Sequence, residues 1–600
     1  MSHGPARPTD RAQRYRIGAD PSGGVTGGRP TYLGLEPSGT LTFLHEPCGA
    51  AAGVGTAVLL CPPFGWEEVC CSRSLRGAAT LLARAGHPTA RLTLPGTADG
   101  AGGPRDGDLV RRWIDAVAAA AAWLRERTDA SRCLAFGIGL GGMLAYLAAR
   151  EHDAIDDLAL WAVPDRGSTL LHEGKSLSKV IASDFREDQG RDPAAAGDLD
   201  LIGYLMTAET QAALSALELS ALALPDCGRR RVLLLSRGAL PVDQGLQDSL
   251  EGQGAEVAVR RTTDYYALMV KPEQSQTPEA TVVQVVDWLA QGPAAAESRS
   301  ALGRRTPPRV RETSELEVAG GVVESPLGYS GSHGEVFGIV SRDPTAGPAP
   351  LALLLLGAGA LPHTGPNRAW VEVGRRWAAR GIPTVRLDLA GIGEAGSEDP
   401  EVLTDDSMHE SWRIDDVRGV LDQLQAAGTA ERFVLGGLCS GANCSLHGAL
   451  ADSRVCGLLL INLFVVTWSG ELITERSRRA AIADGLPNAG IHSLDCSAER
   501  RQGADAIAAF DQLRERGTEV LLLFGEQEAL YQEFARQGLL DQLDRWPNLR
   551  LERIPSRDQM FRAQWLQRHV HERVDEALER MLARLPAGAD WKGLIEEPSA

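Results

Sequence analysis

The chain repeats one order of strand, turn and helix signals along its length, and this internal duplication restricts its fold more than any other feature. Short apolar runs recur in the same order in both halves, and the segments between them read as amphipathic helices rich in Ala, Leu and Arg. The matching segments are 56–65 and 351–360, 87–100 and 382–395, 133–142 and 433–442, 156–165 and 456–465, and 230–238 and 518–526. Buried strands that alternate with helices predict a mostly parallel, doubly wound α/β sheet in each half.

The duplication predicts two tandem domains, the first over residues 31–293 and the second over 313–587. The segment 294–312 between them is rich in Pro, Ala and charged residues, which is typical of an exposed linker. We expect residues 1–30 to form a disordered tail and residues 588–600 to form a second tail.

Each half also contains a long segment between two of its strands, at 166–228 and at about 467–515. Both segments contain helical patterns, such as "TAETQAALSALELSAL" in the first. An insertion at this point of a doubly wound fold would cover the carboxyl ends of the strands. We therefore expect a helical lid in each domain.

Composition excludes several classes of function. A formal net charge of −18 and a pI near 5.2 oppose binding to nucleic acid or to anionic membrane surfaces. The apolar runs 351–361 and 457–466 are too short to span a membrane, and the first thirty residues lack the apolar stretch of a signal peptide. Ten scattered Cys form neither a disulfide framework nor a zinc motif. We expect a cytoplasmic protein without metal or cofactor, whose oligomeric state is open.

The segment "GGLCSGANC" (436–444) follows an apolar strand and precedes a stretch of small residues. Glycines at 437 and 441 with Cys439 between them have the spacing of the sharp strand-to-helix turn that presents a nucleophile. A thiol held there lies at the N-terminus of a helix, which lowers its pKa. Cys439 is therefore the candidate nucleophile, although a buried structural Cys fits the same pattern.

The first half has Gly139 at the matching position, within "GIGLGG" (137–142). Taken alone, this motif predicts a dinucleotide site, with Asp165 at the end of the next strand as the ribose-binding acid. The duplication favours another interpretation, in which the turn has lost its nucleophile. We expect the first domain to be a degenerate site and keep the dinucleotide as a lesser alternative.

The other groups of an acyl-transfer site are sought in three loops. After the first paired strand, "GAGALPHTGPNRAW" (357–370) offers the backbone N–H of Gly359 or Ala360, which with that of Ser440 would hold an oxyanion. The loop "LLFGEQEAL" (522–530) offers Glu526 or Glu528 as the acid.

The loop after the last strand, 552–565, contains no His, and Gln559 stands where the proton carrier is expected. His363, approaching from the oxyanion side, is the remaining candidate base for the thiol. His569 and His571 fall on the terminal helix and are expected to be solvated.

At these residues the second domain resembles α/β-hydrolase superfamily proteins of the serine-aminopeptidase-like type. The similarity is carried by "H-T-G-P-N-R" (363–368), "R-x-D-L-x-G-I-G" (386–393) and "G-L-C-S-G-A" (437–442). The first domain is similar to the partner class with a "P-P-F-x-E-E" loop, and such pairs occur among exosortase-associated hydrolases. The resemblance implies two α/β-hydrolase folds, Cys439 as nucleophile and Glu528 as acid. Its terminal "D-H-T-F" loop reads Asp558-Gln559-Met560-Phe561 here.

These observations lead to two main hypotheses. In the first, the protein hydrolyses or transfers an acyl group of a thioester, ester or amide through Cys439, and the acyl group is carried by a small molecule, a carrier protein or a peptide. In the second, it is a pseudo-hydrolase that binds such a ligand without breaking it. Gly139 and Gln559 motivate the second hypothesis.

Overall fold

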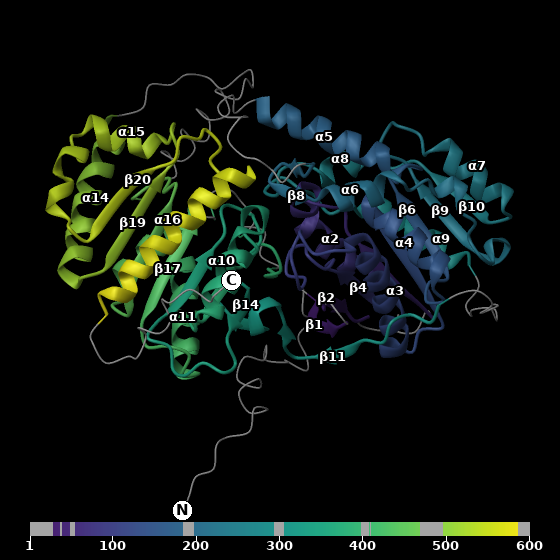
Figure 1. The fold of residues 1–600 in the computed structure, drawn as a ribbon, viewed down its shortest axis with the longest axis horizontal. Coiled ribbons are helices and arrows are strands. Elements are labelled where there is room, and N and C mark those ends of the chain that lie inside the picture. The colour runs from purple at the N-terminus through teal and green to yellow at the C-terminus, as the bar shows by residue number, and fades with distance from the viewer. Residues whose placement is uncertain are drawn as a thin grey trace, which may run out of the picture. The chain divides into compact units, whose positions relative to one another are not determined.

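The computed structural model describes residues 28–35, 39–47, 55–183, 197–292, 305–397, 402, 407, 410–467 and 496–585. It divides into two compact units (Figure 1). Among the described residues, one unit contains residues 28–319 together with Glu324–Pro326, and the other contains Gly320–Val323 and the chain from Leu327 on. The expected tail at 588–600, most of the tail at 1–30 and most of the linker at 294–312 lie outside the described residues.

The first unit is built on a nine-stranded sheet with the order β10-β9-β6-β5-β3-β4-β2-β1-β11. Its strands are β1 (Arg29–Gly34), β2 (Thr40–His45), β3 (Thr56–Cys61), β4 (Thr89–Leu92), β5 (Arg132–Ile138), β6 (Asp157–Trp161), β9 (Arg231–Leu235), β10 (Glu256–Arg260) and β11 (Arg311–Thr313). The six strands from β3 to β10 are parallel, whereas β2 pairs with β4 antiparallel. Strand β11, at the end of the segment expected as a linker, pairs with β1.

Helices cover both faces of this sheet because successive strand residues point to opposite sides. Leu59 and the strand residues that point to the same face of the sheet pack into a core with α3 and α4. Leu60 and the strand residues that point to the other face pack against α2 and α9. The helices are α2 (Trp66–Arg84), α3 (Leu109–Thr128), α4 (Leu140–Glu151), α5 (Gly167–Ser183), α6 (Ala208–Ser215), α7 (Gln244–Gly252), α8 (Tyr265–Leu268) and α9 (Glu279–Ala290).

The second unit repeats this plan. From β13 on, its strands lie in the order β13-β14-β16-β15-β17-β18-β19-β20, which matches the first sheet strand for strand, and β14 pairs with β16 antiparallel. The strands of the second sheet are β12 (Leu316–Glu317), β13 (Val323–Ser330), β14 (Glu335–Arg342), β15 (Ala352–Leu356), β16 (Thr384–Asp388), β17 (Phe433–Leu438), β18 (Val455–Ile461), β19 (Glu519–Phe524) and β20 (Leu549–Arg553). The helices are α10 (Ala369–Ala379), α11 (Trp412–Ala426), α12 (Ser440–Ala451), α14 (Cys496–Arg516), α15 (Ala529–Arg536) and α16 (Gln564–Ala583).

Two mostly parallel sheets with helices on both faces confirm the expected fold class, two α/β-hydrolase-like domains. The first expected lid, 166–228, contains α5, α6 and a hairpin of β7 (Leu199–Leu201) and β8 (Tyr204–Met206). Most of the second, 468–495, lies outside the described residues. The rest of that segment lies in α14, whose residues Phe510 and Leu513 belong to the core of the unit.

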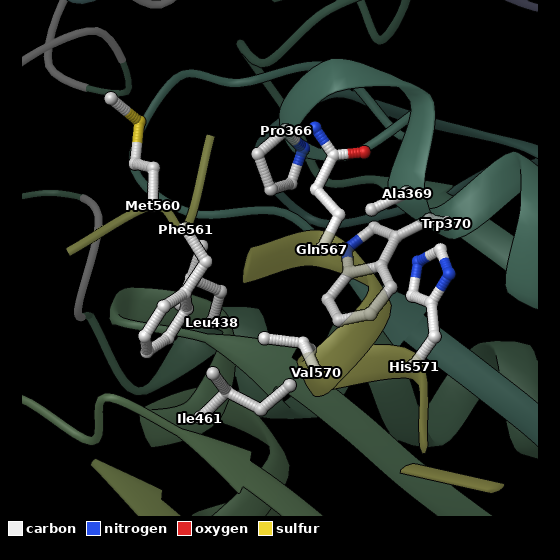
Figure 2. A pocket seen from close by; sticks show the side chains of 10 residues that line it. All are labelled: Pro366, Ala369, Trp370, Leu438, Ile461, Met560, Phe561, Gln567, Val570 and His571. Atoms are coloured by element: carbon white, nitrogen blue, oxygen red, sulfur yellow. The ribbon is translucent and has the colours of Figure 1, made fainter. Parts of the chain in front are cut away.

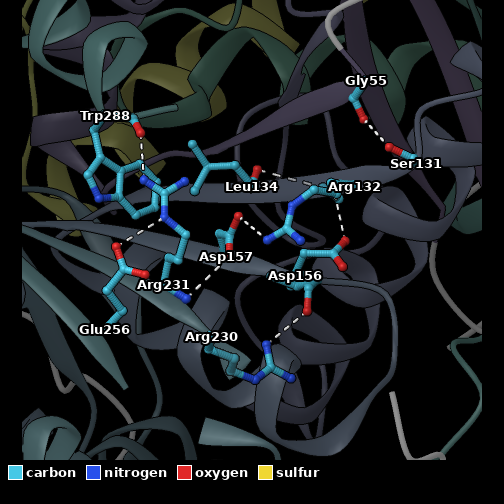
Figure 3. Close-up of polar contacts among 12 residues, drawn as sticks. Gly55, Ser131, Arg132, Leu134, Asp156, Asp157, Arg230, Arg231, Glu256 and Trp288 are labelled. Atoms are coloured by element: carbon cyan, nitrogen blue, oxygen red, sulfur yellow. Dashed lines mark hydrogen bonds and ion pairs between the residues drawn. The ribbon is translucent and has the colours of Figure 1, made fainter. Parts of the chain in front are cut away.

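The amino-terminal edge of the first sheet is held by buried charges (Figure 3). Arg132, at the start of β5, donates to Asp157 Oδ2 over 2.6 Å, and both side chains are almost fully buried. Asp157 Oδ1 accepts the backbone N–H of Arg231, whose guanidinium donates to the carbonyl of Trp288. These contacts tie three neighbouring strands and α9 together at the edge opposite the turn that contains Gly139.

Candidate functional site

Cys439 stands between β17 and α12 in a strained turn. Its backbone has φ 54° and ψ −112°, a combination that side chains other than glycine rarely adopt, and its N–H donates to the carbonyl of Ile461 over 2.9 Å. A Cβ built on Gly437 would lie 2.2 Å from the carbonyl carbon of Gly441, so glycine is required there. The turn expected from the sequence is therefore present.

The loop after β15 touches this turn closely. A Cβ on Gly441 would lie 2.3 Å from the carbonyl oxygen of Gly357, so the loop packs directly on the helix start. The N–H of Gly359 donates to Ser440 Oγ over 2.7 Å. The structure thus brings Gly359 and Ser440, two of the expected oxyanion residues, into contact, and Ala360 lies buried beside Gly359. In this conformation the Gly359 N–H is engaged by the Ser440 hydroxyl.

Cys439 is the one partly exposed thiol among the cysteines of the described chain whose side chains are placed. The others are buried, and burial raises the pKa of the Cys61 thiol to about 12 and that of Cys444 to about 11. Cys439 lies instead at the N-terminus of the twelve-residue helix α12.

His363 is oriented by a carboxylate that sequence reasoning missed. Its Nδ1 lies 2.7 Å from Asp388 Oδ2, and its backbone N–H donates to Asp388 Oδ1 over 2.6 Å. Both residues are buried, and the ring of Phe337 packs edge-on against the imidazole. Burial raises the pKa of Asp388, while His363 opposes that rise. An Asp that binds one ring nitrogen of a His fixes its orientation and tautomer, as in hydrolytic triads.

Asp388 ends β16 within the segment 386–393 that carried the family resemblance. A strand that ends in Asp at the carboxyl edge of a parallel sheet was the available signal. The matching residue of the first half is Thr93, so comparison of the halves gave no hint of it.

Glu528 lies buried just before α15, at the end of the loop that follows β19. The side chain that organises this region is Asn462, which directly follows β18 and has a positive φ of 46°. Its Oδ1 accepts the N–H of Gly525, and its Nδ2 donates to the carbonyl of Gln559 over 2.7 Å. Asn462 thus joins the loop of the expected acid to the loop where a catalytic His was sought. Only its position at a strand end could have indicated it.

Gln559 itself is exposed. The loop around it is shaped by Asp558, whose carboxylate accepts the backbone N–H groups of Met560 and Arg562 and pairs with the Arg562 guanidinium. The Asp558 carboxylate therefore stabilises the turn formed by residues 558–562.

A small apolar pocket of about 20 Å³, with room for about one water molecule, lies beside the turn, between α10, α16 and the ends of β17 and β18 (Figure 2). His571 lines it and is buried, so the expectation that this residue is solvated is wrong, whereas His569 is exposed. The lining residues are Pro366, Ala369, Trp370, Leu438, Ile461, Met560, Phe561, Gln567, Val570 and His571.

The first unit contains the same turn without a nucleophile. Gly139 has φ 52° and ψ −118°, and its N–H donates to the carbonyl of Trp161 over 3.0 Å, as Cys439 does to Ile461. Asp165, the acid of the dinucleotide alternative, accepts hydrogen bonds from the N–H and hydroxyl of Ser220. That carboxylate is therefore already engaged within the protein.

Comparison with known proteins gives distant structural likeness. No protein-family model and no curated protein matches the sequence. An esterase from Pyrococcus furiosus is 13% identical and matches with a TM-score of 0.31, covering 43% of this chain and 92% of its own. A putative dienelactone hydrolase from Klebsiella pneumoniae is 15% identical, with a TM-score of 0.28, and the match covers 44% of this chain and 98% of its own. A carboxylesterase from Bacillus subtilis is 18% identical, with a TM-score of 0.29, and the match covers 42% of this chain and 91% of its own. The fold assignment rests on the strand order and the two turns.

The described residues contain neither a cluster of metal-ligating side chains nor a helix able to cross a membrane. Their His, Cys, Asp and Glu side chains form no group of three or more able to hold a metal ion. No helix among them has the length and apolar character needed to cross a membrane.

Proposed function

We propose that this protein is an acyl-transfer enzyme, a hydrolase or acyltransferase, that uses the Cys439 thiol as its nucleophile. The backbone of Cys439 carries the proposal, because a non-glycine residue at φ 54° and ψ −112° stores strain that persists where it serves a function. The partial exposure of this thiol and its place at a helix start also support the proposal.

In the proposed reaction the Cys439 thiolate attacks the acyl carbonyl carbon and forms a tetrahedral intermediate. The backbone N–H of Ser440 and that of Ala360, or of Gly359 once the Ser440 hydroxyl turns away, stabilise its oxyanion. The bond to the leaving group then breaks, and Cys439 keeps the acyl group as a thioester. Water or another nucleophile attacks this thioester and releases the thiolate, while His363 takes up the proton.

A thioester is the favoured substrate, because a leaving thiolate needs little protonation. The acyl group would be carried by a small molecule, a carrier protein or a peptide. Asp388 would orient His363 and stabilise its cation, the role expected of Glu528 from the family resemblance.

The test is turnover of acyl thioesters by the purified full-length protein. We expect Cys439→Ala to abolish turnover and His363→Gln to lower kcat by roughly 10²–10⁴-fold, the usual contribution of a positioned base. Asp388→Asn should lower kcat and shift the pH profile. Cys456→Ala, which removes a buried thiol, is the control that should keep activity. Full activity in Cys439→Ala contradicts the proposal.

A second candidate function is a pseudo-hydrolase that binds an acyl-bearing ligand, carrier or peptide. Two observations favour it: Gly139 offers no side chain in the first unit, and exposed Gln559 replaces the expected His in the second. It predicts no turnover and no acylated protein in an intact-mass measurement, together with saturable binding of a thioester that Cys439→Ala leaves unchanged.

A further inference from the structure

The first sheet ends in a strand with an open outer edge. Strand β10 lies at one end of the strand order and pairs with β9, and no other strand of the described chain pairs with it (Figure 1). The Glu256 N–H and the Arg260 carbonyl form hydrogen bonds with the residues that flank β9. Because backbone groups point alternately to the two sides of a strand, those of Val257 and Val259 point away from β9. Such outward groups are a template for a further strand.

Apolar side chains are exposed around this edge. Arg261, the residue after β10, donates to the carbonyl of Ala239 and accepts a hydrogen bond from Gln284, so the loop before α7 and helix α9 both contact the strand end. Of the five large hydrophobic side chains exposed in the described chain, four lie on β10 or in these adjoining segments, namely Leu240, Val259, Tyr266 and Val283. Exposed apolar side chains gathered in one place mark an interaction surface.

Two copies of this strand are complementary when they run antiparallel. Strand β10 reads Glu-Val-Ala-Val-Arg over residues 256–260. With Ala258 opposite Ala258 at a two-fold axis, Glu256 of each copy faces Arg260 of the other. Val257 then faces Val259, and their outward N–H and carbonyl groups can bond reciprocally. We propose that β10 pairs in this way with β10 of a second copy of this chain, which gives a symmetric dimer that is independent of the proposed acyl-transfer activity.

Both charged side chains can reach a second copy. The Glu256 side chain is 73% exposed, although its Oε1 lies 3.5 Å from Arg231 Nε (Figure 3). Arg260 is exposed, and its Nη1 donates to the carbonyl of Val259 over 3.0 Å. In the dimer the N–H of Val257 of the second copy takes this carbonyl, and the guanidinium moves to the Glu256 carboxylate of that copy. Arg260 thereby exchanges a neutral acceptor for a carboxylate, which forms the stronger hydrogen bond.

The matching edge of the second unit lacks these features. Strand β20 also ends its sheet, but none of the large hydrophobic side chains exposed in the described chain lies in this unit. Its charges are paired within the unit, because Arg550 contacts Glu552, and Arg573 of α16 contacts Glu552 and Glu576. Charged side chains along an edge strand protect it from further pairing. The edge suited to a second copy is therefore β10.

Sedimentation equilibrium of the full-length protein tests the dimer, which the wild type should form at micromolar concentration. Arg260→Glu places a second carboxylate opposite Glu256, and Glu256→Arg places a second guanidinium opposite Arg260. Each variant alone should weaken the dimer at least about tenfold, because the two-fold axis repeats the repulsion. An equimolar mixture of the two variants should regain the dimer, since opposite charges face each other again in the mixed pair.

Two further variants complete the test. Val259→Pro removes an outward N–H that β9 does not use, so it should weaken the dimer while the unit stays folded, and it serves even if a charge variant does not fold. Arg550→Glu in β20 is the matched control and should leave the dimer unchanged. A monomeric wild type, single charge variants that dimerise as the wild type does, or a mixture that stays monomeric would each overturn the proposal. Loss of the dimer in Arg550→Glu would also overturn it, because the interface would then involve β20.

Discussion

Cys439 occupies a backbone conformation that the first unit assigns to glycine, with φ and ψ of 54° and −112° against 52° and −118° at Gly139. Glycine adopts this conformation without steric strain, so Cys439→Gly should raise the free energy of unfolding by about 1 kcal/mol while abolishing the proposed activity. Urea unfolding of the full chain measures this. Cys439→Ala keeps a Cβ and is the matched control that should show no such gain. Equal stabilities of the two variants would contradict the argument.

The buried carboxyl group of Asp416 should make the free energy of unfolding depend on pH. Burial raises its pKa from 3.8 to about 6, against the effect of Arg413, and its Oδ2 has no hydrogen-bond partner among the described residues. The folded state therefore binds this proton more tightly than the unfolded state. Its stabilising effect is present below about pH 4 and is lost as pH rises to about 6, a change of about 3 kcal/mol.

Asp416→Asn should remove this dependence. The variant should gain stability relative to the wild type between about pH 4 and pH 6.5, whatever constant offset the amide introduces. Denaturant unfolding at several pH values measures the difference of the two curves. If the curves stay parallel over this range, Asp416 is ionised normally in the folded state.

Single residues also show where sequence reasoning stops. Cys439 and its glycines were predictable because a sharp turn dictates their spacing along the chain. Asp388 and Asn462 were not, because each acts by bonding to segments distant in sequence: Asp388 binds His363, and Asn462 joins Gly525 to the loop of Gln559. Such contacts depend on which strands have their carboxyl ends next to one another. They can be predicted only when the order of the strands in the sheet is known.

At the scale of elements, the parallel strands were predictable from the sequence, whereas the antiparallel strands β2 and β14 were not. Strands buried on both faces, such as β15 and β17, are continuous apolar runs that stand out in a sequence. Strands β2 and β14 mix polar and apolar residues, and their pairing with β4 and β16 joins segments separated by a helix and a parallel strand. Local pattern carries little information about such pairing.

The amino ends of β5, β6 and β9 depend on the buried pair of Arg132 and Asp157. Asp157→Asn leaves the Arg132 charge buried without a counter-ion and should lower the free energy of unfolding by about 3–5 kcal/mol. The double variant Arg132→Met with Asp157→Leu removes both charges and should recover most of this loss. Arg29→Gln, which breaks an exposed pair with Glu312, should cost less than about 1 kcal/mol. Equal losses in the single and double variants would show that the charges are not the cause.

On the scale of the whole molecule, the two units share a fold and differ at the centre of the turn. Both units retain the strand order and the glycine-framed turn, yet only the second has a side chain at its centre. The fold depends on many core residues, whereas the reactive group depends on one. Comparison of the halves therefore predicts architecture well and activity poorly.

The two units have separate cores, and this predicts their response to mutation. Among the described residues, the buried clusters around α3 and α4 and around α2 and α9 consist of residues of the first unit, and the cluster around α12 and α14 consists of residues of the second. Because cooperativity follows shared packing, we expect calorimetry of the full chain to resolve two unfolding transitions. Asp157→Asn should lower the midpoint of one, and Cys439→Gly should raise that of the other. A single transition that moves as a whole in both variants would mean that the two cores unfold as one cooperative structure.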